Sequence, residues 1–255
     1  MLDMLKDKSA PSSGGGRALL ALAVLLALAA GVPHRAGAGV EPVTRWDPKL
    51  DRLEADLERG RGSVRTARRI YEAMITETAG FEFAPRALAR AASLLALTEA
   101  QDGRAAEAIW HWHAAHALDR RAVPGDLGRF GAAGALLTER SPRRLGELPA
   151  RLGGPVPAAL TRRAQPAEGS AVHAGVSYCR PAGHLRGQAP PPVTVEVVVA
   201  ADGRPHEPVL QLPSRHPGFA LAVLESIRAW SFEPAVDDRG EPVASLAVVT
   251  VPYPA

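Results

Sequence analysis

The sequence predicts an α+β protein in which a helical region comes first and a small antiparallel sheet, covered by one helix, comes last. Two observations predict this class. Apolar residues repeat at helical spacing between residues 47 and 118, whereas β-branched runs separated by turn residues follow residue 192. The order strand, strand, helix, strand in the last part favours a helix packed across a three-stranded sheet, because that arrangement buries each apolar face.

The composition is that of an ordinary globular protein, with 46% hydrophobic and 22% charged residues in a chain of 255. This length has room for one to two domains. Beyond residue 38 the chain has 26 basic and 25 acidic side chains. No concentrated basic face is therefore indicated, and we expect no nucleic-acid partner.

Residues 1–38 are typical of an export signal. A basic start precedes an apolar run from Ala18 to Val32, and Ala36-Gly37-Ala38 supplies small residues that a signal peptidase can cut. The run is shorter than the roughly 20 residues that a permanent membrane helix needs, so we expect cleavage after Ala38 and a periplasmic protein. The alternative is an uncleaved short anchor, which would hold the protein in the inner membrane, facing the periplasm.

A helical region is expected over residues 45–138. Asp47-Pro48 is typical of a helix start, and the leucines that follow at positions 50, 53 and 57 form one apolar face. Gly60 and Gly62 end this first helix. Further helices are expected over residues 63–80, 85–100, 104–118 and 123–137.

The third and fourth of these helices resemble one tetratricopeptide repeat. Four residues of this chain have the spacing of the repeat's glycine, first alanine, large apolar residue and second alanine. They are Gly103, Ala108, Trp112 and Ala115. The two alanines would let the helices approach closely, while Trp112 would fill the gap beside them. Such repeats need about three copies to be stable alone, so the first two helices are a candidate for a degenerate second unit.

The fourth helix also carries Trp110, His111, His113 and His116. His113 and His116 are about 60° apart on a helical wheel, but His111 lies on another side. We therefore expect partly buried rings on the helix surface and no metal site. Trp110 points roughly away from Trp112, and we expect it to pack on another element; the alternative is an exposed tryptophan that binds a partner.

Residues 139–189 are rich in Pro, Gly, Ala and Arg and are interpreted as a joint between the two regions. Short helical pieces at best, such as Leu145 to Leu152, are expected there. Cys179 is the only cysteine of the chain, so no internal disulfide can form. His173 and His184 are too scattered around it to indicate a metal site. We expect a structural cysteine and no cofactor.

Residues 190–255 are expected to form the second domain. Strands are predicted over residues 193–199 and 208–212, joined through a turn at Asp202-Gly203. Residues 217–229 are predicted to form an amphipathic helix. A final strand is predicted over residues 243–251.

This second domain resembles the C-terminal domain of TonB, the bacterial energy transducer. Trp230 and Phe232 are two residues apart, so in an extended segment they project to the same face and can fill the core. Pro234 then fixes the exit of that segment. The residues that carry the resemblance are the strand 195–199 with Asp202 and Gly203, His216 and Pro217 at the helix start, and Trp230, Phe232, Pro234 and Ala235 after the helix.

The chain departs from the TonB pattern in four places, one of which is the absence of the acidic residue usual near the helix start, where Phe219-Ala220 stands instead. Cys179 follows Tyr178 where the family has a proline, and the transducer's long proline-rich spacer is missing. The apolar run 18–32 lacks the polar side chains expected of a membrane helix coupled to a proton-driven motor. These departures favour a domain that binds over one that transmits force.

The resemblance implies a non-enzymatic protein that binds a cell-envelope protein, for example an outer-membrane receptor, by pairing a sheet edge with an extended peptide. No catalytic or phosphate-binding motif indicates an enzyme. Two alternatives remain, a helical scaffold or adaptor in envelope assembly and a membrane-anchored energy transducer for outer-membrane transport. The residues expected to form the binding edge are Val243, Leu246, Val248, Val249 and Val251.

Overall fold

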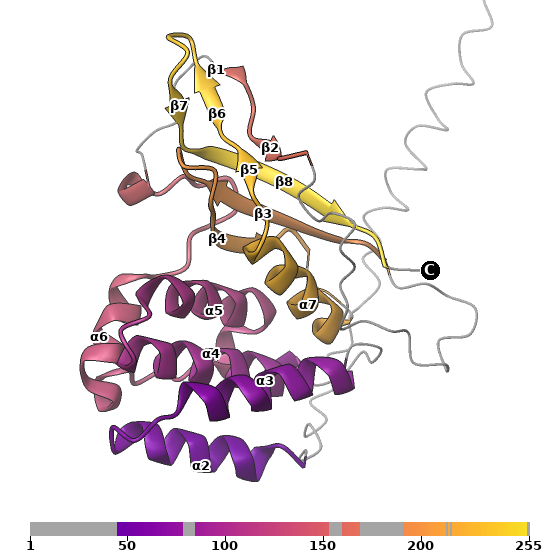
Figure 1. Ribbon diagram of the computed structural model, residues 1–255. Coiled ribbons are helices and arrows are strands. Elements are labelled where there is room, and N and C mark those ends of the chain that lie inside the picture. Colours follow the sequence, from indigo (N-terminus) through magenta and orange to yellow (C-terminus); the bar gives the residue numbers. More distant parts are fainter. Residues whose placement is uncertain are drawn as a thin grey trace, which may run out of the picture. The chain divides into compact units, whose positions relative to one another are not determined.

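The computed structural model describes residues 45–78, 85–152, 160–168, 191–212, 214 and 216–253. Helices come first along the described chain, and the strands with one further helix come later (Figure 1), which confirms the α+β class. The predicted export signal and Cys179 lie outside the described residues. No helix in the described part of the chain is both long and apolar enough to span a membrane.

The helical region is organised around α4, which packs against α2, α3, α5 and α6. Alanines and leucines cover nearly the whole circumference of α4 and are buried. Because alanine side chains are small, neighbouring helices can approach α4 closely from several sides. The helices are α2 (Asp47–Glu58), α3 (Val64–Thr78), α4 (Pro85–Gln101), α5 (Ala105–Leu118) and α6 (Gly131–Glu139).

The helix predicted over residues 123–137 is wrong in its first half, because α6 begins only at Gly131. A 3₁₀ turn, Gly128–Phe130, precedes it. The carboxylate of Asp126 accepts the N–H of Gly128 at 3.0 Å. Such a local bond offers the backbone an alternative to the helix, and the glycines of this stretch weaken the helix further.

The four residues of the tetratricopeptide resemblance lie in and before α5. Gly103 has a φ of 75° in the turn between α4 and α5, a conformation that favours glycine. Ala108 and Ala115 are fully buried in α5, and Trp112 is buried beside them. These positions agree with the packing expected of the repeat, whereas membership of the tetratricopeptide family stays a prediction.

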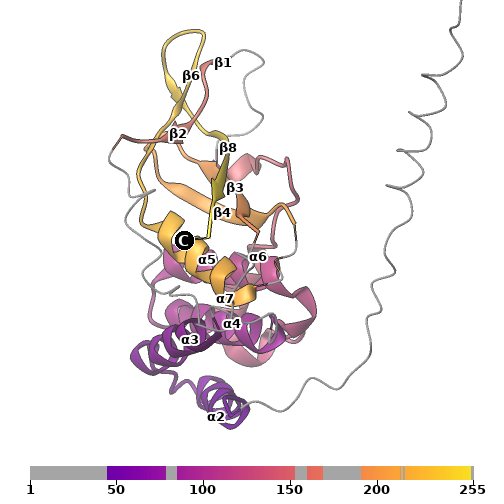
Figure 2. The ribbon, with the colours of Figure 1, turned by 90° about the vertical axis from the view of Figure 1, so that its right-hand side faces the viewer.

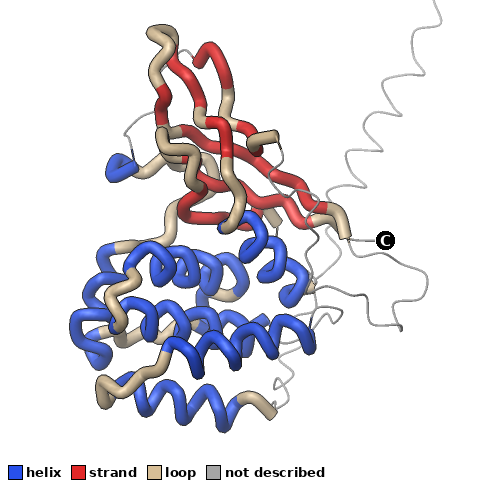
Figure 3. Tube along the Cα trace, in the orientation of Figure 1, coloured by secondary structure: helices blue, strands red, loops and turns tan. Residues whose placement is uncertain are grey.

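The second region is built on a three-stranded antiparallel sheet in the order β4-β3-β8. Figure 3 shows its strands in red and the helices of the described chain in blue. Phe219 and Leu224 of the covering helix share one apolar cluster with alternate valines of the central strand. The core of this region therefore lies between helix and sheet, as the strand order predicted. The elements are β3 (Val193–Val199), β4 (Pro205–Leu210), β8 (Ser245–Val251) and the helix α7 (Pro217–Arg228).

The second strand begins at Pro205, earlier than the predicted start at residue 208. Its register against β3 shifts between Glu196 and Val198, and Glu207 has a φ of 47°. This is the geometry of a β-bulge, in which one strand carries an extra residue. The alternation of the sequence does not reveal such a residue.

The predicted final strand, residues 243–251, is two strands. Its first residue, Val243, belongs to β7 (Pro242–Val243), which pairs with β6 (Ala235–Asp237). The chain then changes partner and continues as β8 along β3. Val243 is therefore not part of the β8 edge.

The joint contributes strands that its composition did not predict. β1 (Leu160–Arg162) pairs with β6, and β2 (Gln165–Pro166) pairs with β5 (Phe232–Glu233). Strands of two or three residues are too short for an alternation to show in the sequence. The helical piece expected in this stretch is a single 3₁₀ turn, Ala150–Leu152.

α7 is covered on both sides. It packs on β3 and β4 and also contacts α3, α4 and α5, and both views show it between the sheet and the helical region (Figures 1 and 2). Most of its residues, from Pro217 through Leu224, are buried. The sequence therefore underestimates how much of α7 is buried. The helical region covers the side of α7 that would otherwise face water.

Candidate partner-binding edge

β8 forms one edge of the β4-β3-β8 sheet, and within the described residues β3 is the strand that pairs with it. The pairing is continuous from Val193 opposite Val251 to Val199 opposite Ser245. In such a strand every second residue turns its N–H and C=O away from the paired neighbour. β8 therefore presents a row of backbone groups that a further strand could use.

The side chains of β8 alternate between the core and the opposite face. Ala247, Val249 and Val251 are buried in the cluster under α7, whereas Val248 is 55% exposed. Leu246 is half-buried. Of the residues expected to bind, Val249 and Val251 can therefore contribute only backbone groups, while Leu246 and Val248 also present side chains.

Gly203 joins two parts of the TonB-like motif. It has a φ of 79° in the turn between β3 and β4, and a Cβ there would lie 2.3 Å from the carbonyl oxygen of Phe232. The Phe232 N–H donates to the carbonyl of Gly203 at 2.9 Å, while the Asp202 carboxylate accepts the N–H of Arg204 at 3.0 Å. Only glycine fits both the conformation and the close approach.

The aromatic pair of the motif lies in the core. Trp230 is 6% exposed and Phe232 is 4% exposed, and their ring centroids are 6.3 Å apart. Ala235 is fully buried, and Pro234 between them is half-buried. The spacing argument for Trp230 and Phe232 thus agrees with their burial.

His216 and Pro217 begin α7, as the motif predicted. Pro217 is the first helical residue, where its missing N–H costs nothing. The carbonyl of His216 accepts the N–H of Ala220 at 3.0 Å. These residues set the direction in which α7 crosses the sheet.

Arg143, from the predicted joint, holds the bulge of β4 against β3. Its guanidinium donates to the carboxylate of Glu196 at 2.5 Å, to the carbonyl of Glu196 at 2.8 Å and to the carbonyl of Glu207 at 2.9 Å. Arg151 donates to the Glu207 carboxylate at 2.6 Å. Because Glu196 and Glu207 are almost fully buried, these pairs satisfy charges that would otherwise be costly.

A second buried cluster ties α7 to the helical region. His111 of α5 lies between two carboxylates, 2.5 Å from Glu99 of α4 and 3.0 Å from Glu225 of α7. The Tyr71 hydroxyl of α3 donates to Glu225 at 2.9 Å, and Arg68 donates to Glu99 at 2.6 Å. Four helices therefore meet in one network of hydrogen bonds.

The network favours charged His111. Burial alone would lower the pKa of His111, but the charge of Glu225 and the hydrogen bonds to Glu225 and Glu99 outweigh it and raise the pKa to about 9. Burial alone would raise the pKa of Glu225, yet the charge and hydrogen bond of His111 lower it to about 2. At neutral pH an imidazolium thus bridges two carboxylates.

The other histidines of α5 are neutral at pH 7. Burial lowers the pKa of His113 to about 3 and that of His116 to about 4. Neither ring is within reach of a carboxylate pair, and the described residues hold no group of three or more side chains suited to a metal ion. Trp110 is 4% exposed and packs within the protein, which is the packed alternative that the sequence favoured.

The sequence patterns did not predict a role for Glu99, Glu196 or Glu225. A signal was present for Glu196, the only charged residue of the run Val-Thr-Val-Glu-Val-Val-Val. A carboxylate buried in such a run requires a cationic partner. The identity of that partner, Arg143, follows only from the fold.

The comparisons with known proteins bear on the part of the chain that carries this edge. Residues 188–254 match the family model described as Gram-negative bacterial TonB protein C-terminal. No curated protein and no solved structure shows significant similarity to the chain. The matched span contains β3, β4, α7 and β5 to β8, and it includes no residue of α2 to α6.

TonB C-terminal domains are periplasmic and non-enzymatic, and they bind outer-membrane receptors. The family agrees with the expectation that this protein is not an enzyme. The family match and the motif residues in the core lead to the same conclusion: residues 188–254 form a TonB C-terminal domain.

Proposed function

We propose that the protein acts in the cell envelope, where its C-terminal domain binds an outer-membrane or periplasmic protein by accepting an extended segment along β8. The observation that carries the proposal is the unpaired outer side of β8 within the described residues, in a domain whose family binds outer-membrane receptors. Strand addition uses main-chain hydrogen bonds, so it needs no special side chain.

The chemistry of β8 supports this mode of binding. Proteins usually protect a sheet edge with charged side chains, prolines or bulges. β8 has the sequence Ser-Leu-Ala-Val-Val-Thr-Val, without a charge, proline or glycine, and its pairing with β3 has no register shift. The strand is therefore straight enough to accept a partner along its length, and Val248 offers an apolar contact beside it.

Site-specific crosslinking tests this proposal. A photo-crosslinking amino acid placed at Val248 should capture an outer-membrane receptor in intact cells, because the partner strand would lie beside this residue. The matched control is Leu212, which is 77% exposed and lies outside β8. Equal receptor capture from both positions, or none from Val248, would contradict the proposal.

A second candidate is a helical scaffold or adaptor whose C-terminal domain docks it in the envelope. The observation that favours it is the buried network in which Tyr71 and His111 of the helical region bind Glu225 of α7. This network joins the helical region to the C-terminal domain through hydrogen bonds. Crosslinks from α2 or α3 to a periplasmic protein, with none from Val248, would favour this candidate.

A further inference from the structure

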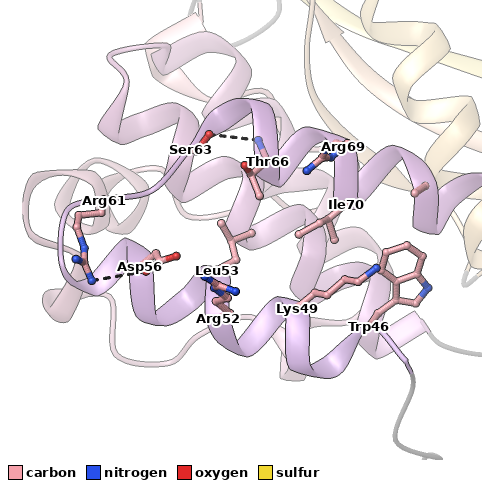
Figure 4. Close-up of a pocket in the computed structure, with 11 residues that line it drawn as sticks. Trp46, Lys49, Arg52, Leu53, Asp56, Arg61, Ser63, Thr66, Arg69 and Ile70 are labelled. Carbon is pink, nitrogen blue, oxygen red and sulfur yellow. Dashed lines mark hydrogen bonds and ion pairs between the residues drawn. The ribbon is translucent and has the colours of Figure 1, made fainter.

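α2 and α3 enclose a groove of about 550 Å³ on the helical region (Figure 4). All its lining residues come from the start of α2, from α2 itself, from the turn after it and from α3. The groove is therefore a site separate from β8, and the TonB family match does not include it. Its volume lies in the range of sites that bind ligands or peptide side chains.

The floor of the groove is apolar. Leu53 of α2 and Ile70 of α3 point toward one another across it, and Trp46 closes one end (Figure 4). The Trp46 indole donates to Glu77 at 2.9 Å, and the ammonium of Lys49 lies 4.2 Å from the centroid of its ring. The aromatic wall is thus fixed in place before anything binds.

The rim of the groove is cationic. Lys49, Arg52, Arg61 and Arg69 line it, against a single carboxylate, Asp56. Asp56 lies 3.8 Å from Arg61, a long contact. Arg52 and Arg69 are exposed and make no ion pair with a described residue. The positive charge of the rim is therefore largely available to a ligand.

We infer that this groove binds an acidic segment of another protein, in which carboxylates alternate with apolar side chains. The carboxylates would pair with Arg52 and Arg69, and the apolar side chains would cover Leu53 and Ile70. An arginine fork matches a carboxylate with two parallel hydrogen bonds. A purely anionic polymer such as a nucleic acid would leave the apolar floor unused.

Outside the described residues, the printed sequence has four acidic side chains, Asp3, Asp7, Glu41 and Glu82. They are scattered, and no stretch there alternates several carboxylates with apolar residues. The cationic rim and apolar floor therefore favour an acidic segment of another protein over these residues. With β8 as well, the molecule could hold two protein partners at once.

Fluorescence polarisation tests the inference with a panel of labelled octapeptides that alternate Glu or Asp with Leu or Val. Peptides of this panel should bind the full chain, and the Arg52→Glu, Arg69→Glu double variant should weaken binding by about tenfold or more, because like charges then face each other. The matched control is the Arg121→Glu, Arg239→Glu double variant. Both arginines are exposed and lie outside α2, α3 and the groove, so reversing their charges should leave the affinity unchanged.

Two further probes define the chemistry. The same peptides with Gln and Asn in place of Glu and Asp should lose binding. A single-stranded oligonucleotide and vesicles with anionic lipid should bind no better to the parent than to the double variant. The inference fails if no acidic peptide binds, if the double variant binds as the parent does, or if only the phosphate-bearing probes depend on Arg52 and Arg69.

Discussion

At Gly203, two constraints act on the same residue. Its φ of 79° is one that side chains disfavour, and its Cα faces the carbonyl of Phe232. Gly240 has a similar φ of 82°, but a Cβ there would meet no atom within 4 Å. Comparing substitutions at Gly203 and Gly240 therefore separates the free-energy cost of the backbone conformation from that of the steric clash.

We predict that Gly203→Ala lowers the free energy of unfolding by about 3 kcal/mol or more, whereas Gly240→Ala lowers it by about 1–2 kcal/mol. The difference measures the clash with Phe232, which forces the segment after α7 away from the turn. Urea unfolding followed by circular dichroism measures both values. Equal losses in the two variants would show that the turn and the aromatic segment are not in contact.

At the scale of single residues, the sequence predicts the turn and the burial of the aromatic pair, but not the contact between them. The Asp202-Gly203 pair indicates a turn, and the spacing of Trp230 and Phe232 indicates burial. Gly203 and Phe232 are 29 residues apart in the sequence. Their contact depends on how the chain returns to the turn after α7. Local patterns contain no information on that approach.

Among the elements, α7 is the one that both regions share. Its sheet-facing residues were predictable from their helical period, but its contact with α3, α4 and α5 was not. The reason is physical. Glu225 and His111 show in the sequence as polar residues that could face water, and their pairing arises only because two helices 114 residues apart come together.

The pairing gives a pH dependence with a defined sign. His111 has a folded-state pKa of about 9 against a usual 6.5, so its stabilisation is complete below pH 6.5 and is lost as the pH rises through 9. His113 and His116 have lowered values, about 3 and about 4, so their contribution is complete above pH 6.5 and is lost as the pH falls. Stability should therefore be greatest near pH 6.5.

We predict that the free energy of unfolding falls by up to about 3 kcal/mol between pH 6.5 and 9.5. Glu225→Gln removes one carboxylate from His111 and lowers its folded-state pKa, so in this variant the decline should still begin near pH 6.5 but should end at lower pH and be smaller. Glu241→Gln is the control, because Glu241 is exposed and lies in a turn. A flat profile for the parent, or the same profile for Glu225→Gln, would contradict the role given to His111.

At the scale of the whole described chain, the helical region and the sheet region pack against each other through α7 and β4. The described residues belong to one compact unit, Val43–Ala255, and the joint supplies Arg143, Arg151 and two strands to the sheet region. The class, the order of elements and the sheet of three strands followed from the sequence. The contribution of the joint to the sheet region did not follow from the sequence, because short strands and arginines in a proline-rich stretch resemble a linker.

The packing of these two regions bears on the proposed function. The helical region covers the side of α7 that faces away from the sheet, and α5 contacts β4, the other edge strand of the β4-β3-β8 sheet. The groove between α2 and α3 and the β8 edge therefore belong to the same compact unit.

Amide hydrogen exchange tests the central claim, the addition of a partner strand to β8. The probes are synthetic peptides that tile the periplasm-facing segments of outer-membrane receptors from Gram-negative bacteria. A peptide that binds should slow exchange in Ser245–Val251 and leave β3, already paired on both sides, unchanged. Val248→Pro should abolish this protection in a protein that remains folded by circular dichroism, and Val248→Thr should preserve it. Protection confined to α2 and α3, or a folded Val248→Pro variant that binds with undiminished affinity, would contradict the account.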